Sequence, residues 1–470
     1  MKKYLILAVV VIALVVIGGY FFLFGRKDVC KSVIPENAKA VMVLDAKQLA
    51  SQLDINITDI IRFLQSDKNE KTGIDVLSPM YGFLSSEGYM CGVLPLSDAD
   101  DMEDFLKEKK VEVESQRGFR WAYTAQMLLC FDDKKALALG PISQVESHNM
   151  RPRMVEWMEQ GSSKSPLLPS VLDQDGALRL CSKMSVVPSS YMQQALQYLN
   201  NPFDMDKVFL NATLGVEDKA LHLSTSIQSE EEEMQQLLSQ HNSIFRPIQA
   251  NRLKSSVSDP VVWVGFNANG DSLLVELRKN ALVRMFLMGV NLCMDADMLI
   301  KSIDGDVSLE LSAPSEYTLK AQVTKQDFLK NVSDWSTGFL HKSYSFKPVD
   351  KNNFVLQGDG KNTYFGVIDN QVYVSTNQNV TKLSENNASD DFVTRYNSQI
   401  QGKLFYASVS INKLTRFREV QNMMSDDAKK FYYFLDKTDR LTVSAKDYLH
   451  YDIELTTKDN ISDFIKLLLK

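Results

Sequence analysis

Hydrophobic and polar positions along the chain follow two periods, one typical of strands and one typical of helices. Short apolar runs such as Ala40–Leu44 and Tyr89–Leu96 indicate strands, whereas Leu49–Leu64 has apolar residues three and four apart, as in a helix that buries one face. Leu128–Phe131 and Ala136–Leu139 flank four polar residues, which indicates a hairpin. The first half of the chain therefore predicts strands, hairpins and covering helices.

Four predicted helices begin in the same way. Each has a serine or threonine that can cap the first turn, followed by acidic residues that complement the partial positive charge of a helix N-terminus. These helices start near Ser97, Ser229, Thr324 and Thr457. The apolar residues that we expect them to bury against antiparallel sheets are Phe105, Leu238, Phe328 and Phe464. Their acidic residues are expected to stay in solvent and to bind no metal.

The pattern of the first half returns in the second half. Gly176–Val186 reads like Gly402–Asn412, and Leu221–Ile227 corresponds to Leu449–Thr456 at nearly the same separation. Between the halves, His241–Pro260 has little periodicity, which is typical of a linker. The sequence predicts an α+β fold of two tandem, internally duplicated units, with antiparallel sheets covered by helices. The predicted domains are an anchor at residues 1–27, a first unit at 28–250 and a second unit at 251–470.

The beginning of the chain is strongly apolar. Leu5–Phe24 is a run of apolar residues and glycines, about 20 residues that could cross a hydrocarbon core of roughly 30 Å as a helix. The run ends in bulky aromatic residues instead of a small-residue cleavage site, so we expect a retained transmembrane helix before the two units. Lys2 and Lys3 favour a cytoplasmic N-terminus, with the bulk of the chain on the periplasmic side of a bacterial inner membrane. The alternative is a lipoprotein modified at Cys30, which the charged residues before that cysteine disfavour.

Composition narrows the classes of function. The net charge of −7 leaves no basic footprint for nucleic acid, and 44% hydrophobic with 24% charged residues is ordinary for a globular protein. Five cysteines are too few for a disulfide scaffold. Cys91 and Cys130 fall in candidate strands of one unit and could be neighbours, which leaves a bond between them open. Small buried residues with free thiols are the favoured interpretation for each cysteine.

Two local patterns suggest chemistry but have the wrong spacing. Gly358–Lys361 looks like a phosphate loop, yet only one residue separates its glycines, so a hairpin turn is favoured. Asp173–Gly176 looks like part of a calcium loop, yet Val171 and Ser182 stand where anchoring carboxylates are needed, so a turn is again favoured. The five histidines form no zinc-like spacing. The sequence therefore predicts no cofactor and no metal site, and leaves any catalytic residue unknown.

Three segments of the sequence resemble a known family. Val33–Lys47, Gly73–Tyr81 and Gly360–Thr376, the last including Asp369–Ser375, resemble an uncharacterised family of Bacteroidetes cell-envelope proteins of similar length. The resemblance covers most of the chain after the apolar segment, and it implies an envelope location and a duplicated α+β fold. It implies no catalytic residue. Many members of that family begin as lipoproteins, whereas this chain begins with an apolar anchor.

We expect a membrane-anchored, non-enzymatic cell-envelope protein that works as a binding or interaction module. The expected partners are the membrane, through the N-terminal helix, and an envelope protein, a glycan or an apolar ligand, but no nucleic acid. One alternative is a hydrolase or transferase of envelope polymers with an unrecognised carboxylate site, and another is a structural spacer. An exposed apolar cleft would favour binding, convergent carboxylates the enzyme, and a smooth polar surface the spacer.

Overall fold

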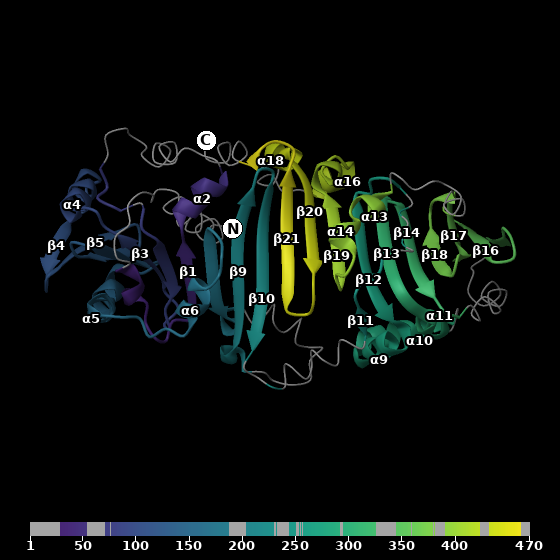
Figure 1. Cartoon of the computed structure of the whole chain (residues 1–470), viewed down its shortest axis with the longest axis horizontal. Helices are drawn as coiled ribbons and strands as arrows, with labels where there is room; N and C mark the ends of the chain where they lie inside the picture. The colour runs from purple at the N-terminus through teal and green to yellow at the C-terminus, as the bar shows by residue number, and fades with distance from the viewer. Residues whose placement is uncertain are drawn as a thin grey trace. The chain divides into compact units, whose positions relative to one another are not determined.

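The computed structural model describes most of the chain after residue 28. The described residues are 29–53, 71–75, 77–187, 204–229, 232, 244–250, 253, 255, 257–291, 295–325, 345–358, 360–378, 380, 391–423 and 432–461. Two units separate by their internal contacts: unit 1 comprises residues 1–188, 204–230 and 459–470, and unit 2 comprises 189–203 and 231–458 (Figure 1). The domain limits expected from the sequence, with a break after residue 250, stay a prediction.

Unit 1 is built on one antiparallel sheet. In their order across the sheet, its strands are β4 (Val113–Gln116), β5 (Phe119–Thr124), β6 (Met127–Phe131), β7 (Lys135–Gly140), β3 (Met90–Pro95), β2 (Met80–Leu84), β1 (Ala40–Leu44), β8 (Leu178–Lys183), β9 (Val208–Glu217) and β10 (Ala220–Ser229). The hairpin expected around residues 132–135 is confirmed, with Leu128 opposite Leu139. Left-handed pairs such as Arg117–Gly118, between β4 and β5, make the tight turns that suit twisted hairpins.

Helices cover both faces of the sheet of unit 1. The 3₁₀ turn η1 (Cys30–Val33) and helices α5 (Gln144–Glu159) and α6 (Leu167–Leu172) pack on one face, and α4 (Ala99–Glu108) packs on the other. Strand β7 shows the cause, because Leu137 belongs to the first core and Ala136 to the second. A strand that is apolar on both sides must be covered on both sides. The remaining short elements of unit 1 are α2 (Ala46–Leu53), η2 (Met184–Val186) and η3 (Met205–Lys207).

Helix α4 differs in detail from the expected one. Its N-cap is Asp98 and not Ser97, because the Asp98 carboxylate accepts the backbone N–H groups of Asp100 and Asp101 at 2.8 and 3.2 Å. The helix buries Met102 and Leu106, which lie four residues apart, and leaves Phe105 only partly buried. Phe105 therefore packs against this core as expected, but it is buried only in part. The matching expectations for Leu238, Phe328 and Phe464 concern residues outside the described ranges.

Unit 2 is also built on antiparallel strands. In order, its strands are β15 (Ser345–Pro348), β16 (Asn353–Gly358), β17 (Lys361–Ile368), β18 (Gln371–Ser375), β14 (Glu316–Val323), β13 (Ile303–Ala313), β12 (Val262–Asn269), β19 (Phe405–Ser410), β20 (Thr438–Ala445) and β21 (His450–Thr457). The short β11 (Phe245–Arg246) pairs with the end of β12. The strands follow one another along the chain and across the sheet in the same order as those of unit 1.

The helices that the structure describes in unit 2 come in three groups. The first, α9 (Gly270–Lys279), α10 (Ala281–Asn291) and α11 (Ala296–Ser302), follows β12. The second, α13 (Phe392–Arg395) and α14 (Asn397–Ile400), precedes β19, and the third, α15 (Ile411–Leu414), α16 (Arg418–Met423) and α18 (Tyr432–Lys437), precedes β20. Trp263 of β12 packs between Phe392 and Tyr406, with ring centroids 5.6 and 5.9 Å away. This aromatic cluster joins the second group of helices to the sheet.

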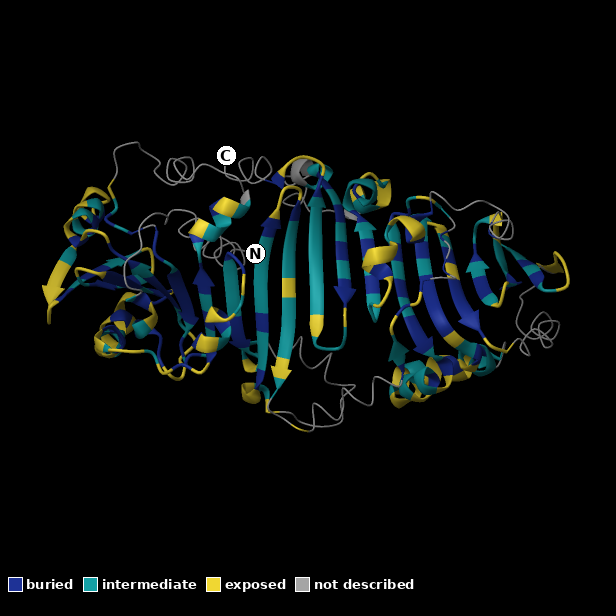
Figure 2. Cartoon of the chain, viewed as in Figure 1, coloured by how far each residue is buried: buried dark blue, intermediate teal, exposed yellow. Residues whose placement is uncertain are grey.

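The predicted fold class, in which helices cover the antiparallel sheets of two α+β units, is wrong, although the two units do share one strand order. The structure is mixed but strand-rich, and one large antiparallel sheet dominates each unit. Helices cover only part of each sheet, since β9, β10 and β21 are half-buried along most of their length (Figure 2). Cap patterns indicate where helices begin, but strand length depends on pairing with residues distant in the sequence.

The expected transmembrane segment Leu5–Phe24 lies outside the described residues. Among the helices that the structure describes, none is long and apolar enough to cross a membrane.

Candidate functional site

A hollow of about 530 Å³ opens on unit 1 where four short segments meet. These segments are η1, the turn between β6 and β7, the loop before α6, and α6 itself. The lining residues are Val29, Lys31, Ser32, Asp132, Lys134, Lys135, Gly161, Ser162, Ser163, Ser165, Leu168, Pro169 and Leu172. We call this hollow the Lys135 pocket. Its wall combines three lysines and four serines with an apolar side from α6.

The Asp132 carboxylate shapes the turn that carries the central lysine. Its Oδ1 atom accepts the backbone N–H groups of Lys134 and Lys135 at 2.8 and 2.9 Å. The Asp132 N–H in turn donates to the carbonyl of Lys135 at 3.0 Å. An aspartate that binds the backbone two and three residues ahead is a common way to fix a tight turn. The turn leaves Lys134 in solvent and sets Lys135 at the start of β7, in the pocket wall.

Lys135 is buried, with only 8% of its surface exposed. Its Nζ atom donates to the carbonyl oxygen of Met158 at 2.8 Å and lies 3.4 Å from the hydroxyl oxygen of Ser32. Burial lowers the pKa of Lys135, and the charge of Asp132 partly opposes this effect. An ammonium group can donate three hydrogen bonds. The Met158 carbonyl and the more distant Ser32 hydroxyl replace only part of the hydration that Lys135 loses on burial. An anion in the pocket would oppose this effect and favour the charged form of the lysine.

The serine loop forms the opposite side of the pocket. Ser163 Oγ donates to the carbonyl of Ile34 at 2.9 Å and accepts the N–H of Ser165 at 3.2 Å, so the loop is tied to η1. Ser165 is 4% exposed, and its hydroxyl has no hydrogen-bond partner among the described residues. Buried hydroxyls are normally satisfied, so this one is available to a bound group after a small adjustment.

Lys135 and Ser32 do not form a catalytic pair. A serine nucleophile needs a base that accepts its proton, and a lysine with a lowered pKa can serve in that role. Here the Ser32 hydroxyl donates to the carbonyl of Val29 at 2.8 Å, so its proton points away from Lys135. Nζ donates to Met158 instead of accepting from a hydroxyl. The geometry suits charge recognition better than proton transfer.

Two motif interpretations are confirmed. Gly358 pairs with Lys361 across the hairpin of β16 and β17, and Gly360 has a φ of 72°, as a tight turn requires. Asp173–Gly176 lies between α6 and β8 as a turn, where the Asp175 carboxylate accepts the side-chain amide of Gln48 at 2.6 Å. Both segments serve the fold.

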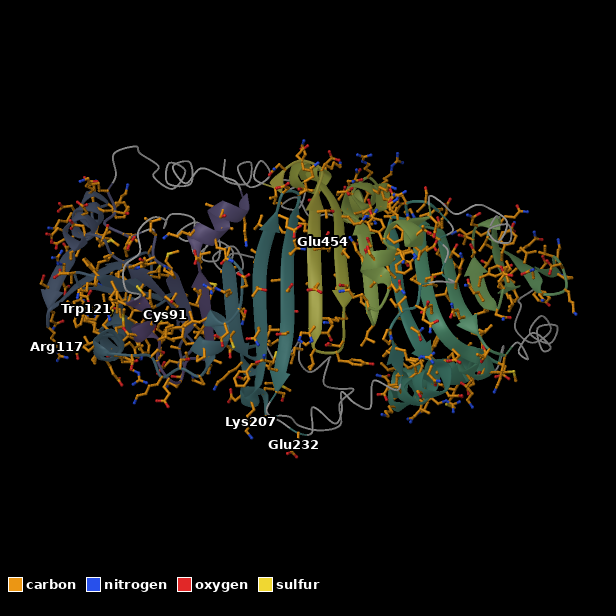
Figure 3. The ribbon with its side chains drawn as sticks, viewed as in Figure 1. Cys91, Arg117, Trp121, Lys207, Glu232 and Glu454 are labelled. Atoms are coloured by element: carbon orange, nitrogen blue, oxygen red, sulfur yellow. The ribbon has the colours of Figure 1, made fainter. Side chains whose placement is uncertain are left out.

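Four of the cysteines carry buried free thiols: Cys30, Cys91, Cys130 and Cys181. This confirms the free-thiol interpretation for those four, while Cys293 lies outside the described residues. Cys91 is on β3 and Cys130 on β6, with β7 between them in the sheet. Cys91 is labelled in Figure 3. Burial raises the pKa of Cys130 to about 12 and that of Cys181 to about 11, which keeps these thiols protonated and poor nucleophiles.

Acidic residues and histidines do not gather into a site in the part of the chain that the structure covers. No three His, Cys, Asp or Glu side chains lie close enough there to hold a metal ion. The first-turn carboxylate of Asp100 pairs with Arg120 at 2.8 Å. His148 is an exposed residue of α5, and the His450 ring contacts the carboxylate of Asp447 in the turn before β21. Sequence reasoning missed the Lys135 pocket because its lysines and serines come from segments about 130 residues apart along the chain.

The family model described as a domain of unknown function, DUF4836, matches residues 61–462. The chain belongs to this family. The matched range includes the β6–β7 turn and the serine loop, whereas η1 lies before it. The comparison with curated proteins gives no significant match.

Crystal structures of TP0453 show a slight similarity to the chain. Crystal forms IV, I and III align with TM-scores of 0.27, 0.28 and 0.28 at 10% sequence identity. The alignments cover 44–46% of this chain and 83–87% of the TP0453 chain. A similarity of this size assigns neither a fold nor a function to the DUF4836 chain.

Proposed function

We propose that this DUF4836 protein is a non-enzymatic binding module of the cell envelope, and that the Lys135 pocket holds the carboxylate or phosphate group of its ligand. The single observation that supports this is the buried Lys135, which lines a pocket together with two further lysines and one carboxylate. Charge-assisted hydrogen bonds from lysine to an anion are about twice as strong as neutral ones. The pocket is therefore locally basic in a chain with a net charge of −7.

The apolar side of the pocket suggests what carries the anion. Leu168, Pro169 and Leu172 of α6 stand beside the lysines and serines. A sugar ring offers C–H groups to such a side and hydroxyls to the serines, while its acidic substituent reaches Lys135. An acidic or phosphorylated glycan combines these features. Glycans were among the partners expected from the sequence.

The envelope location is part of the same proposal. Its support is the apolar run Leu5–Phe24 with lysines before it, which suits a membrane anchor with the rest of the chain outside the cytoplasm. The resemblance to Bacteroidetes cell-envelope proteins points to the same location. Carbonate extraction of native membranes tests whether the apolar segment stays in the membrane. Protease treatment of intact spheroplasts tests whether the rest of the chain lies outside the cytoplasm.

Isothermal titration calorimetry of the full chain in detergent tests the pocket. The probes are glucuronate, glucose 6-phosphate, inorganic phosphate and neutral glucose. We expect the two acidic sugars to bind, glucose to bind at least about tenfold more weakly, and Lys135→Met to remove the difference, because a hydrogen bond to a charged group contributes about 1.5–3 kcal/mol. Comparison of glucuronate with glucose 6-phosphate distinguishes the two anions, and inorganic phosphate shows whether the sugar is needed.

Lys164→Met is the matched control. Lys164 lies in the same serine loop and is exposed, but it does not line the pocket. Its loss should leave binding of the acidic sugars unchanged. Equal weakening by Lys164→Met and Lys135→Met would mean that binding is a diffuse charge effect, and the pocket proposal would be rejected. Thermal melting of both variants verifies that each is folded.

A further inference from the structure

We infer that the outward face of α10 in unit 2 docks on an anionic lipid surface. This inference is independent of the Lys135 pocket, which lies in unit 1. Helix α10 spans Ala281–Asn291, and its only charged residue is Arg284. A helix that is apolar all round is normally enclosed by protein or lipid. In α10, one side is enclosed and the other is open.

The inner side of α10 packs in the small core of the α9–α11 group. Leu287 is buried there with Leu274 of α9 and Ala296 of α11, and Val283 and Val290 are partly buried beside them. Positions 283, 287 and 290 follow the three- and four-residue spacing of one helix face. This stripe is sufficient to hold α10 on its neighbours.

The outer side carries a second apolar stripe. Leu282, Met285, Phe286 and Met288 are 78%, 68%, 69% and 65% exposed. Val275 of the neighbouring helix α9 is also exposed, at 64%. Positions 282, 285 and 286 again have the spacing of one face. Single exposed apolar residues are common, but a contiguous set of this kind marks an interaction surface.

The chemistry of this stripe favours lipid over protein as its occupant. Protein interfaces surround an apolar centre with polar residues and make roughly ten hydrogen bonds. On the outer side of α10, the one side chain that forms strong hydrogen bonds is Arg284, at the edge of the apolar stripe. In addition, one helix face is smaller than the roughly 800 Å² that each partner buries in a stable dimer. Acyl chains need no hydrogen bonds, and an interfacial helix inserts about 5–10 Å.

Arg284 favours an anionic surface. Arg278 and Lys279 at the end of α9 are neutralised by Asp297 and Glu276, respectively. Arg284 is exposed and forms no ion pair among the described residues, and α10 contains no carboxylate that would repel lipid phosphates. A long arginine side chain can keep its charge at headgroup level while the apolar stripe enters the lipid. The charge and the apolar stripe thus fit the same surface.

Lipid photolabelling of the full chain tests this inference. The chain is reconstituted in vesicles of phosphatidylglycerol and phosphatidylcholine that contain a photoactivatable phospholipid, and adducts are located by tryptic mass spectrometry. Cleavage after Arg284 gives a peptide that begins at Met285 and carries most of the stripe. We expect adducts at residues 285–288, and an adduct yield at least about fivefold lower in the double variant Met285→Ser, Phe286→Ser.

Two comparisons complete the experiment. Val145→Ser removes a 78% exposed valine from α5 of unit 1 and should leave the α10 adducts unchanged. Vesicles of phosphatidylcholine alone should give fewer α10 adducts, and Arg284→Gln should remove that dependence on lipid charge. Absence of adducts from α10 while other peptides are labelled would overturn the inference. So would cross-linking of α10 to α10 of a second copy without lipid adducts.

Discussion

The two units differ most in the polarity of the strand faces that lie under α5 and α6 in unit 1 and under α13 and α14 in unit 2. In unit 1 the face under α5 and α6 is apolar, and its buried residues include Val43, Tyr81, Val93 and Leu137. In unit 2 the face under α13 and α14 holds Trp263, but the neighbouring strands place polar residues beside it. These buried residues include Ser308, Glu310, Lys320, Ser375 and Ser408. The same strand order therefore supports two kinds of interior.

The difference shows that the same strand order can be stabilised in two ways. Apolar residues gain stability by leaving water, without regard to direction. Buried polar groups are stabilised when they find a partner, and several of those in unit 2 do so over short distances. Asp306 accepts the side-chain amide of Asn267 at 2.7 Å and the N–H of Ala250 at 2.9 Å. The Thr318 and Ser375 hydroxyls are 2.7 Å apart. Unit 2 thus depends more on directional contacts.

The largest expected effect is on the apolar face of unit 1. Trp157 of α5 is buried and meets Phe83 edge to face, with ring centroids 5.4 Å apart. Trp157→Ala removes that contact and leaves a cavity, so we expect a loss of about 3–5 kcal/mol in the free energy of unfolding. Urea denaturation followed by circular dichroism measures it. A loss below about 1 kcal/mol would show that this face is not a tightly packed core.

A somewhat smaller loss is expected from the directional contacts of unit 2. Arg440 is buried, donates to Ser408 Oγ at 2.9 Å and Asp259 Oδ1 at 2.5 Å, and stacks over Phe392 at 5.3 Å. Arg440→Met should cost about 2–3 kcal/mol of unfolding free energy, because Ser408 and Asp259 lose a charged partner. Arg416→Met, which breaks an exposed pair with Asp436, should cost less than about 1 kcal/mol. Equal losses would remove the distinction between buried and exposed pairs.

Acid should weaken the same contact. Burial tends to raise the pKa of Asp259, but hydrogen bonds and charges from Lys413 and Arg440 outweigh it and hold the pKa below its ordinary value. A lowered carboxylate pKa contributes stability above the unfolded value of about 3.9, and this contribution is lost as pH falls through the folded pKa. Melting temperatures between pH 6 and pH 3 should therefore fall more steeply in the wild type than in Asp259→Asn. Parallel curves would contradict the assignment.

The smallest expected effect concerns the thiols on the apolar face of unit 1. Burial raises the pKa of Cys91 as well as those of Cys130 and Cys181. A thiol-specific reagent at pH 8 should leave these three residues unmodified in the native protein and should label them after denaturation in guanidinium chloride. Mass spectrometry of the labelled peptides measures both states. Rapid native labelling of Cys130 would show that the core opens readily.

Local patterns predicted local structure well and tertiary chemistry poorly. The apolar runs Leu128–Phe131 and Ala136–Leu139, with polar residues between them, located a hairpin, because a turn involves adjacent residues. The apolar residues Ala136 and Leu137 of β7 did not indicate that helices cover both faces of the sheet of unit 1. They also did not indicate which helices these are. The Lys135 pocket combines segments that approach one another only through the sheet. Its one signal in the sequence was the polar turn Asp132–Lys135, which does not tell that Lys135 is buried.

The central claim is that Lys135 holds an anion, and a crystal structure with selenate tests it most directly. Anomalous scattering from selenium locates the ion without prior assumptions, and selenate has the charge and shape of a phosphate-like group. We predict a selenium peak in the Lys135 pocket, with an oxygen within about 3 Å of Lys135 Nζ, and no peak there in Lys135→Met. Selenate bound only at exposed lysines such as Lys164, with the pocket empty, would contradict the account.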